Sequence, residues 1–480
     1  MSSVELTQAD QYERSPPTCG FTFRRWVEVA RLRVAASDML KRTAAALSAA
    51  SLVCLAFGSE LAAAENGDYP RLAHYMVGPA PLGDAYMQDY LAKLDWAVVN
   101  VWPGWRGSGG VTVEQALRAV KDRSPGTKLF VYIDNNELYD TSDGNDAFNE
   151  VRSKVDSMNW WLYPSGGGGT RVKSTWGDNY HILNTSNFSP RDSEGKNFNE
   201  WMADWSVSTY VANNPSVDGL FTDNVFWKPR VDGDWDRNGS TDSANNSSTQ
   251  TLFRQGYRAY FDRMQQKLPP GKLILGNVAD WYDAANGGVN LTEFQGQLHG
   301  GVLEAAVGKS YSVESVLGWA GLMKAYRQTL AQMSAPKLLL FEQFGKLNDY
   351  QSFRYGFTSA LMDDGYYEYG DIDGQIRTAW FDEYDAKLGK AVSSPPTSAW
   401  SKGVYRRDFE DGIALVNPRG NGTVEVQLDG SYRLISGNQA PSVNTGATVT
   451  SVRLNDRDGL ILLRTSAKPR PLPPSGLSVQ

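Results

Sequence analysis

The chain has 480 residues, of which 41% are hydrophobic and 21% are charged. This balance is ordinary for a soluble globular protein, and the length leaves room for one to three domains. The formal net charge is −7 and no Lys/Arg run occurs, which argues against nucleic acid or an anionic membrane as the partner. Fifteen tryptophans are a high load, and several of them follow expected strands.

The N-terminal part resembles an export signal preceded by an extension. Residues 39–64 begin with a short cationic segment, continue with an apolar run over 44–57 and end in small residues, as a cleaved signal peptide does. We expect 1–38 to be a misassigned extension and the mature protein to be secreted or periplasmic, with no stable membrane span. An uncleaved anchor is the alternative. Both cysteines, Cys19 and Cys54, precede the expected cleavage site, so the mature chain would have no disulfide.

Short apolar segments alternate with helical patterns through the next part of the chain. Eight segments are typical of parallel strands buried on both faces, and they lie at 74–78, 96–102, 128–134, 217–224, 272–278, 300–307, 337–344 and 363–370. Amphipathic spacing predicts helices at 112–121, 197–212, 248–267, 313–333, 349–361 and 381–391. Thr112 and Gln115 have the spacing of a capping box at the start of the first of these helices.

This alternation predicts an α/β fold in which residues 65–395 form a (β/α)8 TIM barrel. A doubly wound open sheet is the alternative, but it would need a Gly-rich phosphate turn after the first strand. Beyond residue 395 the strands become short and are separated by Gly, Asn and Asp turns. We therefore expect a C-terminal antiparallel β-sandwich domain over 396–466 and a Pro-rich linker over 467–480.

Carboxylates end several of the expected barrel strands, where TIM barrels carry their active sites. Asp223 ends the fourth strand and is the strongest candidate, because a carboxylate there is costly to desolvate unless it has a task or a partner. A salt-bridged structural Asp is the alternative. Glu304 on the sixth strand and Glu342 on the seventh are rivals for a second role. Cleavage of a glycosidic bond needs two carboxyl groups, one to protonate the leaving oxygen and one to attack or to activate water.

Other side chains at the same rim are suited to hold a sugar. Flat aromatic faces fit the C–H faces of sugar rings, and polar groups fit hydroxyls. We assign substrate binding to Trp102, Trp105, Asp134, Asn136, Asn224, Trp227, Asn277, Trp281 and Glu368. The alternative for each tryptophan is that it covers the core, and Glu368 could instead pair with a neighbouring cation.

The segment after the fourth strand resembles a calcium loop. It reads D-x-D-x-N-G-x-x-D, so Asp234, Asp236, Asn238 and Asp242 are candidate ligands of a structural calcium. The twelfth position is Asn245 in place of a bidentate Glu, and an acidic solvated turn is the alternative. The three histidines are widely spaced and no HExxH or CxxC occurs, so we expect no catalytic zinc and no cofactor for catalysis.

Several motifs together resemble a group of bacterial barrel proteins regarded as glycosyl hydrolases, themselves distantly similar to the α-galactosidase clan and to endo-α-1,4-polygalactosaminidases. The resemblance covers about residues 70–465 and rests on VDGLFTDNVFW, GGVLEAAVG, DDGYYEYGD, WFDEYDAKLGKA and the ALVNP…LILLR region. In the α-galactosidase clan a carboxylate ending the fourth strand is the nucleophile and one ending the sixth is the acid/base. The resemblance thus implies Asp223 as nucleophile and Glu304 as acid/base. That clan usually has Asp at the sixth strand, so Glu342 stays as the alternative acid.

The expected function is therefore hydrolysis of glycosidic bonds in an extracellular polysaccharide or oligosaccharide. A non-catalytic glycan-binding surface protein on a barrel scaffold is the alternative. A metal-dependent carbohydrate esterase is disfavoured by the few histidines. The sugar, the linkage, endo or exo action, the stereochemical outcome and the oligomeric state are left open by the sequence.

Overall fold

The computed structural model describes residues 67–76, 82–101, 111–140, 146–166, 168–283, 289–290, 292–372 and 378–465. These residues belong to one compact unit, Asn66–Gln480. The expected extension, signal peptide and C-terminal linker lie outside the described residues, as do Trp102 and Trp105.

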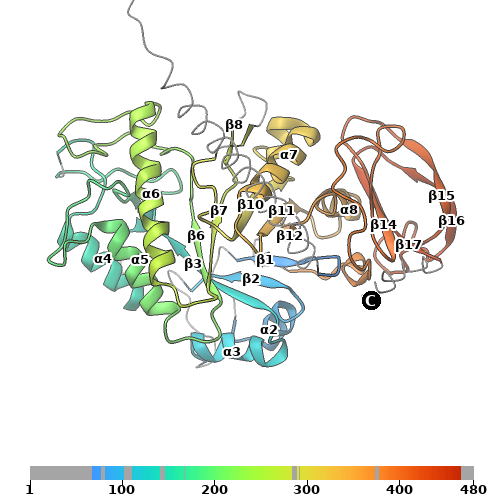
Figure 1. The fold of residues 1–480 in the computed structure, drawn as a ribbon, viewed down its shortest axis with the longest axis horizontal. Coiled ribbons are helices and arrows are strands. Elements are labelled where there is room, and N and C mark those ends of the chain that lie inside the picture. Colours follow the sequence, from blue (N-terminus) through green and yellow to red (C-terminus); the bar gives the residue numbers. More distant parts are fainter. Residues whose placement is uncertain are drawn as a thin grey trace, which may run out of the picture. The chain divides into compact units, whose positions relative to one another are not determined.

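Eight parallel strands form one sheet that nearly closes into a barrel (Figure 1). In sheet order they are β1 (Ala73–Tyr75), β2 (Trp96–Val99), β3 (Lys128–Asp134), β6 (Gly219–Asp223), β7 (Leu273–Asn277), β10 (Gly300–Val307), β11 (Leu338–Gly345) and β12 (Tyr366–Asp371). The first and last strands meet through a parallel bridge between Leu72 and Tyr367. Each expected strand overlaps one of these. The sheet follows chain order throughout, whereas a doubly wound sheet reverses at a switch point, so that alternative is wrong.

Helices connect the strands and cover the outside of the sheet (Figure 1). They are α2 (Ala85–Leu91), α3 (Val113–Arg123), α4 (Asp146–Met158), α5 (Phe198–Tyr210), α6 (Ser247–Lys267), α7 (Val313–Gln332) and α8 (Tyr350–Ala360). The capping box of α3 is confirmed, because Thr112 accepts from the Gln115 backbone and Gln115 accepts from the Thr112 backbone. Helices α2 and α4 were not among those expected from the residue pattern.

The helix expected at 381–391 is wrong. Only a 3-10 turn, η3 (Asp382–Asp385), forms there. Farther on, the Leu388 amide donates to the Tyr69 carbonyl at 3.0 Å, and the Tyr69 amide donates to the Gly389 carbonyl at 2.9 Å. These long-range bonds use backbone groups that a helix would have paired within itself.

Two small antiparallel pairs lie in the loops that follow β3 and β7. They are formed by β4 (Glu137–Tyr139) with β5 (Tyr180–Ile182), and by β8 (Tyr282–Asp283) with β9 (Val289–Asn290). The β4–β5 pair continues directly from the end of β3. It therefore places the long loop after β3 beside the carboxyl ends of the barrel strands.

The C-terminal strands form one antiparallel sheet, where we expected two sheets packed as a sandwich. In sheet order they are β13 (Tyr405–Asp408), β14 (Gly412–Asn417), β17 (Asp458–Arg464), β15 (Val424–Leu434) and β16 (Thr448–Leu454). Strand β15 changes register between Gln427 and Tyr432, and its second half also pairs with β17. This irregularity lets one sheet enclose its own small core around Ile413, Leu415 and Leu462.

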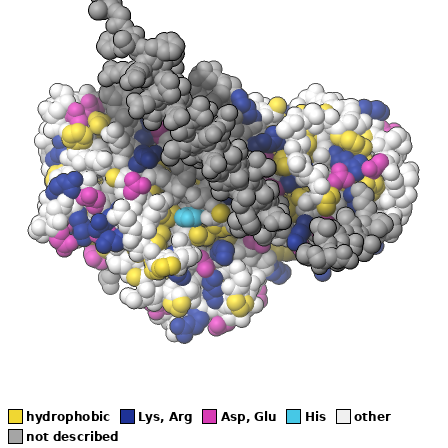
Figure 2. All heavy atoms as spheres, viewed as in Figure 1, with side chains coloured by type: hydrophobic (Ala, Val, Ile, Leu, Met, Phe, Trp, Pro, Cys, Tyr) yellow, Lys and Arg dark blue, Asp and Glu magenta, His cyan; other side chains and the backbone are white. Residues whose placement is uncertain are grey.

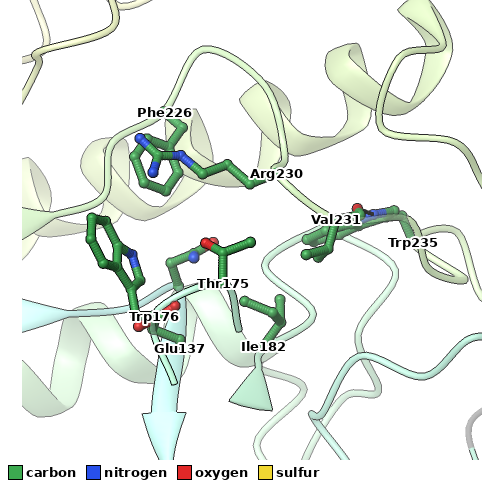
Figure 3. A pocket seen from close by; sticks show the side chains of 9 residues that line it. Glu137, Thr175, Trp176, Ile182, Phe226, Arg230, Val231 and Trp235 are labelled. Carbon is green, nitrogen blue, oxygen red and sulfur yellow. Dashed lines mark hydrogen bonds between the residues drawn. The ribbon is translucent and has the colours of Figure 1, made fainter. Parts of the chain in front are cut away.

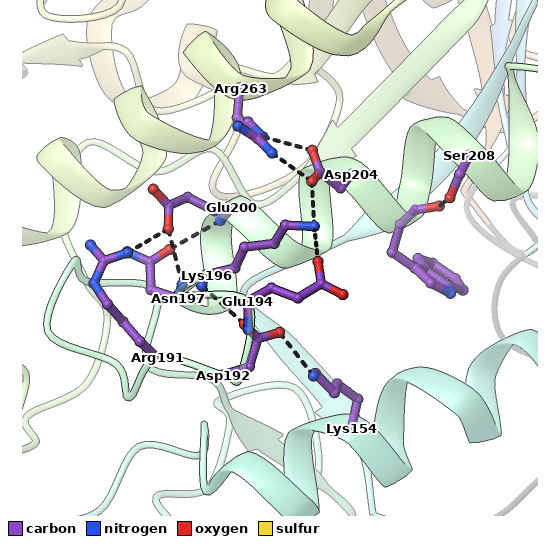
Figure 4. Close-up of polar contacts among 11 residues, drawn as sticks. Lys154, Arg191, Asp192, Glu194, Lys196, Asn197, Glu200, Asp204, Ser208 and Arg263 are labelled. Atoms are coloured by element: carbon purple, nitrogen blue, oxygen red, sulfur yellow. Dashed lines mark hydrogen bonds and ion pairs between the residues drawn. The ribbon is translucent and has the colours of Figure 1, made fainter.

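Surface charges tie the helices α4, α5 and α6 together (Figure 4). Lys154 pairs with Asp192 at 2.9 Å, and Lys196 pairs with Asp204 at 2.9 Å. Arg263 also binds Asp204 through two bonds of 2.7 Å. Acidic and basic side chains are interspersed over the face that Figure 2 shows. Among the residues described, no helix is both long and apolar enough to cross a membrane.

Candidate active site

Acidic and amide side chains meet at the carboxyl ends of the barrel strands. Asp134 and Asp223 lie opposite each other in the β3–β6 pairing. Glu342 and Glu368 lie opposite each other in the β11–β12 pairing. Asn277 ends β7 beside β10, the strand that carries Glu304. The expected concentration of carboxylates at one rim is therefore present.

Asp223 is surrounded by hydrogen-bond donors. Its Oδ2 accepts from the Tyr132 hydroxyl at 2.5 Å. Its Oδ1 accepts from Asn277 Nδ2 at 2.9 Å and from the backbone amide of Asn224 at 2.8 Å. Burial, together with the charges of Asp223 and Asp134, raises the pKa of Tyr132 far above its ordinary value, so the phenol stays protonated and remains a donor.

The Asn277 amide joins Asp223 to Glu304. The same Nδ2 atom donates to Glu304 Oε2 at 2.6 Å and to Asp223 Oδ1 at 2.9 Å. The distance between these two carboxyl oxygens is therefore at most the sum of the two N···O distances. Burial, and then the charge of Asp223, raise the pKa of Glu304 to about 7. Glu304 is only half-buried, so it combines a raised pKa with access from outside.

A β-bulge sets the direction of Glu304. The β10–β11 pairing shifts register between Leu303 and Val307, and Ala305 has a left-handed backbone with φ of 49°. Asn224, which follows Asp223, is also left-handed with φ of 55°. Left-handed residues other than glycine cost about 1–3 kcal/mol and gather at functional sites. Both candidate catalytic residues are thus followed by a strained position.

Glu342 lies deeper than Glu304. It is 3% exposed, and its Oε2 accepts from the backbone amide of Ala305 at 3.1 Å. Burial, and then the charges of Glu304 and Glu368, raise its pKa well above the ordinary value. Its hydrogen bond supports the bulge, and its side chain is more buried than that of Glu304.

Glu368 does not fit the expected role in substrate binding. It is buried, one oxygen contacts Nδ1 of buried His74, and the other accepts from the Tyr75 amide at 2.7 Å. Both of its oxygens are therefore engaged inside the barrel.

The tryptophans expected at the rim differ in exposure. Trp281 is 1% exposed, its ring stacks on Phe294 with centroids 5.2 Å apart, and its indole N–H donates to the Val225 carbonyl at 2.8 Å. It covers the core and offers no face to a sugar, so that assignment is wrong. Trp227 is half-buried, and the Arg254 guanidinium lies 4.1 Å from its ring centroid. At most one face of the Trp227 ring is therefore open to a sugar.

Asp134, Asn136 and Asn224 form one polar network beside Asp223. Asp134 Oδ1 accepts from the backbone amide of Asn136 at 2.9 Å, and its Oδ2 accepts from the side-chain Nδ2 of Asn224 at 3.0 Å. Burial, and then the charges of Glu137 and Asp223, raise the pKa of Asp134 well above its usual range. The three expected sugar-binding residues are thus brought together.

A small cleft next to this network was missed by sequence reasoning (Figure 3). Trp176, 59% exposed, and Glu137 lie on one side. On the other, the Arg230 guanidinium lies 3.8 Å from the Phe226 ring centroid and 5.6 Å from that of Trp176. Burial raises the pKa of Glu137 to about 7, although a hydrogen bond from Ser174 opposes the shift. Glu137 closely follows the third strand, so the residue pattern already indicates its place at the rim. Trp176 and Arg230 lie within loops whose path the sequence does not reveal.

Three of the four expected calcium ligands, the carboxylates, lie close together. Asp234, Asp236 and Asp242 each offer a carboxylate oxygen within 4.8 Å of the others. Asn238 Nδ2 donates to Asp236 at 2.9 Å. Asn245, at the twelfth position, instead accepts from Lys228 Nζ at 3.2 Å.

Residues 121–413, more than half of the chain, match the family model described as hypothetical glycosyl hydrolase family 15. No curated protein sequence matches the chain. Solved structures with a similar fold include a cycloalternan-degrading enzyme from Trueperella pyogenes, with 12% identity and a TM-score of 0.46 over 82% of this chain and 62% of that one. The cycloalternan-forming enzyme from Listeria monocytogenes has 11% identity and a TM-score of 0.42 over 83% and 41%. The chain therefore spans less than two thirds of either enzyme. With TM-scores below 0.5, its classification rests on the family match.

Proposed function

The chain belongs to hypothetical glycosyl hydrolase family 15, and we propose that it is a glycoside hydrolase that cleaves glycosidic bonds in an extracellular polysaccharide or oligosaccharide. The observation that carries the proposal is the pair formed by Asp223 and Glu304, which share the Asn277 amide at the carboxyl end of the barrel. In finer terms, we assign the fold as a (β/α)8 barrel whose catalytic residues lie on the fourth and sixth strands, toward their carboxyl ends, as in the α-galactosidase clan.

The proposed reaction has two steps. In the first, an Asp223 oxygen attacks the anomeric carbon while Glu304 gives its proton to the departing glycosidic oxygen. This step forms a glycosyl ester and releases the leaving sugar. In the second, the Glu304 carboxylate takes a proton from water, and the resulting hydroxide displaces Asp223 from the anomeric carbon. The two carboxyl groups supply all of the proton transfer and nucleophilic chemistry, so the proposal invokes no cofactor.

The short separation of the two carboxyl groups favours retention of configuration. Retaining enzymes hold their carboxyl groups about 5–5.5 Å apart, whereas inverting enzymes leave about 6.5–9.5 Å for a water molecule. Hydrogen bonds of 2.9 Å and 2.6 Å from one nitrogen leave no room for the larger spacing between the bonded oxygens. We therefore propose a retaining mechanism.

Glu304 suits the acid role better than Glu342. A general acid must be protonated near neutral pH and must reach the leaving oxygen. Glu304 meets both requirements, since its pKa is raised to about 7 and its side chain is half-buried. Glu342 is 3% exposed and holds the bulge at Ala305. We assign it a supporting role.

Sugar binding is assigned to the network of Asp134, Asn136 and Asn224 and to the cleft beside it. The exposed ring of Trp176 offers a flat face, and the nearby Arg230 guanidinium offers donors to sugar hydroxyls. Among the described residues, no carboxylate lies within ion-pair distance of Arg230, and we assign its guanidinium to hydrogen bonds with sugar hydroxyls.

The test is a screen of the purified protein for new reducing ends on a panel of polysaccharides and aryl glycosides. Asp223→Ala should abolish turnover on every substrate. Glu304→Ala should lose about 10²–10⁴-fold on a natural glycoside, keep most activity on an aryl glycoside with an activated leaving group, and form a glycosyl azide when azide is added. Glu425→Ala, an exposed carboxylate on β15, is the control and should behave as the wild type.

The same experiment separates the alternatives. Binding to polysaccharides without new reducing ends would favour a non-catalytic glycan-binding protein. Azide rescue of Glu342→Ala, but not of Glu304→Ala, would identify Glu342 on β11 as the general acid. Wild-type turnover in Asp223→Ala would contradict the assignment of the fourth strand.

The proposal includes export of the chain. We propose cleavage after the signal peptide at 39–64, which leaves the barrel at 65–395 and the C-terminal sheet domain at 396–466 in a secreted or periplasmic protein. The N-terminal sequence of protein recovered from the medium or periplasm should begin near Glu65.

A further inference from the structure

Three carboxylates face one another in the loop between β6 and α6. Asp234, Asp236 and Asp242 each offer an oxygen within 4.8 Å of the other two. None of them forms an ion pair with a Lys, Arg or His among the described residues. Three like charges at this distance repel one another, and a cation between them would remove that repulsion.

Asp234 supplies a second, independent observation. It is 2% exposed, and its Oδ2 accepts from the Gly166 amide at 2.7 Å and from the Gly239 amide at 3.0 Å. Its Oδ1 is also buried but has no hydrogen-bond partner among the described residues. A buried carboxylate oxygen without a partner is costly. A metal ion at the cluster would provide that partner.

The ligand chemistry selects the kind of cation. Every ligand offered is an oxygen, which suits calcium and disfavours zinc or copper. The carboxylates stand at positions 1, 3 and 9 of the loop, and Gly239 stands at position 6 with φ of 92°. We propose that Asp234, Asp236 and Asp242 bind one calcium ion. Asn245 replaces the bidentate Glu and is bonded elsewhere, so the dissociation constant should fall in the range of about 10⁻⁵–10⁻³ M.

The ion would hold the loop after β6 against the long segment between β3 and β6. Besides the Gly166 bond, the Asp234 amide donates to the Tyr163 carbonyl at 2.8 Å, and the Ser186 hydroxyl donates to the Trp235 carbonyl at 2.6 Å. Trp235 lines the same cleft as Trp176 and Arg230. Calcium therefore fixes the wall of the cleft. This consequence, unlike the binding itself, rests on the proposed function.

Terbium luminescence tests the binding directly, because the Trp235 indole lies within the loop and can sensitise a bound lanthanide. The purified protein is stripped with a chelator and titrated with Tb³⁺, and Ca²⁺ is then used to displace it. Asp236→Asn and Asp234→Asn should each weaken Ca²⁺ binding at least tenfold. Asp232→Asn is the matched control, since Asp232 lies outside the cluster and accepts from the Ala244 amide.

Thermal unfolding gives a second readout. At a Ca²⁺ concentration 100 times the dissociation constant, Tm should rise by about 2–6 °C in the wild type and in Asp232→Asn, but not in Asp236→Asn. The Asp236 side chain is half-buried and bonds only to Asn238 among the described residues, so this variant should fold even if Asp234→Asn does not. Removal of calcium should raise KM more than it lowers kcat.

Absence of both Ca²⁺-displaceable luminescence and a Tm shift in the wild type would overturn the calcium site. Equal binding by Asp236→Asn and the wild type would overturn the assigned ligands. Binding with no change in KM would overturn only the link to the cleft. None of the binding readouts needs a substrate, so a failure of the proposed hydrolase activity would remain distinguishable.

Discussion

Asn277 is the residue on which the proposed catalytic pair depends. An amide nitrogen carries two hydrogens and can donate to two carboxyl groups at once. Here one hydrogen is directed to Asp223 and the other to Glu304, and the latter bond lowers the pKa of Glu304 against the opposing effect of burial. Asn277 therefore sets both the spacing of the pair and the protonation of the acid.

The pH dependence of activity follows from this arrangement. Glu304 must be protonated to act as the acid, so kcat/KM should fall as pH rises through its pKa of about 7. Asn277→Ala removes a bond that lowers this pKa, so the alkaline limb should move to higher pH while the rate falls. Glu137 also has a pKa of about 7, and Glu137→Gln serves as the control. If the fall of kcat/KM at high pH disappeared in Glu137→Gln but remained in Glu304→Gln, the general acid would be Glu137.

The candidate site could be predicted from sequence only where a residue's position follows from strand order. Asp223 and Asn277 end apolar strands and Glu304 lies in the last half of one, and parallel strands bring their carboxyl ends to one edge, so their meeting follows from the pattern. The burial of Trp281 does not follow, because it depends on Phe294 in a distant turn. The exposure of Trp176 likewise depends on the path of a long loop.

At the scale of elements, the bulge in β10 decides where Glu304 points. Side chains in a regular strand alternate between faces, so the apolar neighbours of Glu304 in sequence say little about its surroundings. The register shift and the left-handed Ala305 change that alternation at the end of the strand. The Glu342 carboxylate accepts from the Ala305 amide and holds the bulge in place. The sequence GGVLEAAVG gives no sign of it, because the partner comes from the next strand.

Two substitutions at Ala305 should have opposite outcomes. Glycine adopts a φ of 49° readily, so Ala305→Gly should keep the bulge and near wild-type kcat. A β-branched residue is strained there, so Ala305→Val should lower the free energy of unfolding by about 1–3 kcal/mol and kcat by at least tenfold. Denaturant unfolding and steady-state kinetics measure the two effects. Equal activity in both variants would show that the bulge does not orient the acid.

At the scale of the whole molecule, the C-terminal sheet is joined to the barrel through ion pairs, one of them fully buried. Arg354 on α8 binds Asp458 on β17 through bonds of 3.1 Å and 3.2 Å, and both side chains are buried. Arg407 on β13 contacts Asp364 in the segment before β12 and donates to the Leu361 carbonyl at 3.1 Å. These partners are far apart in sequence. Residue patterns therefore indicated two regions but could not show that they share an interface.

This interface predicts that the barrel and the sheet unfold together. Removing one partner of a buried ion pair leaves the other charge buried and unpaired, which costs about 3–5 kcal/mol. Arg354→Ala should therefore lower the free energy of unfolding by about that amount while the transition stays single. Arg123→Ala breaks an exposed pair with Asp89 and should cost at most about 1 kcal/mol. Circular dichroism and tryptophan fluorescence should give the same midpoint for each variant. Two separate unfolding transitions in the wild type would contradict this prediction. They would mean that the C-terminal sheet unfolds without the barrel and so does not depend on its contact with α8.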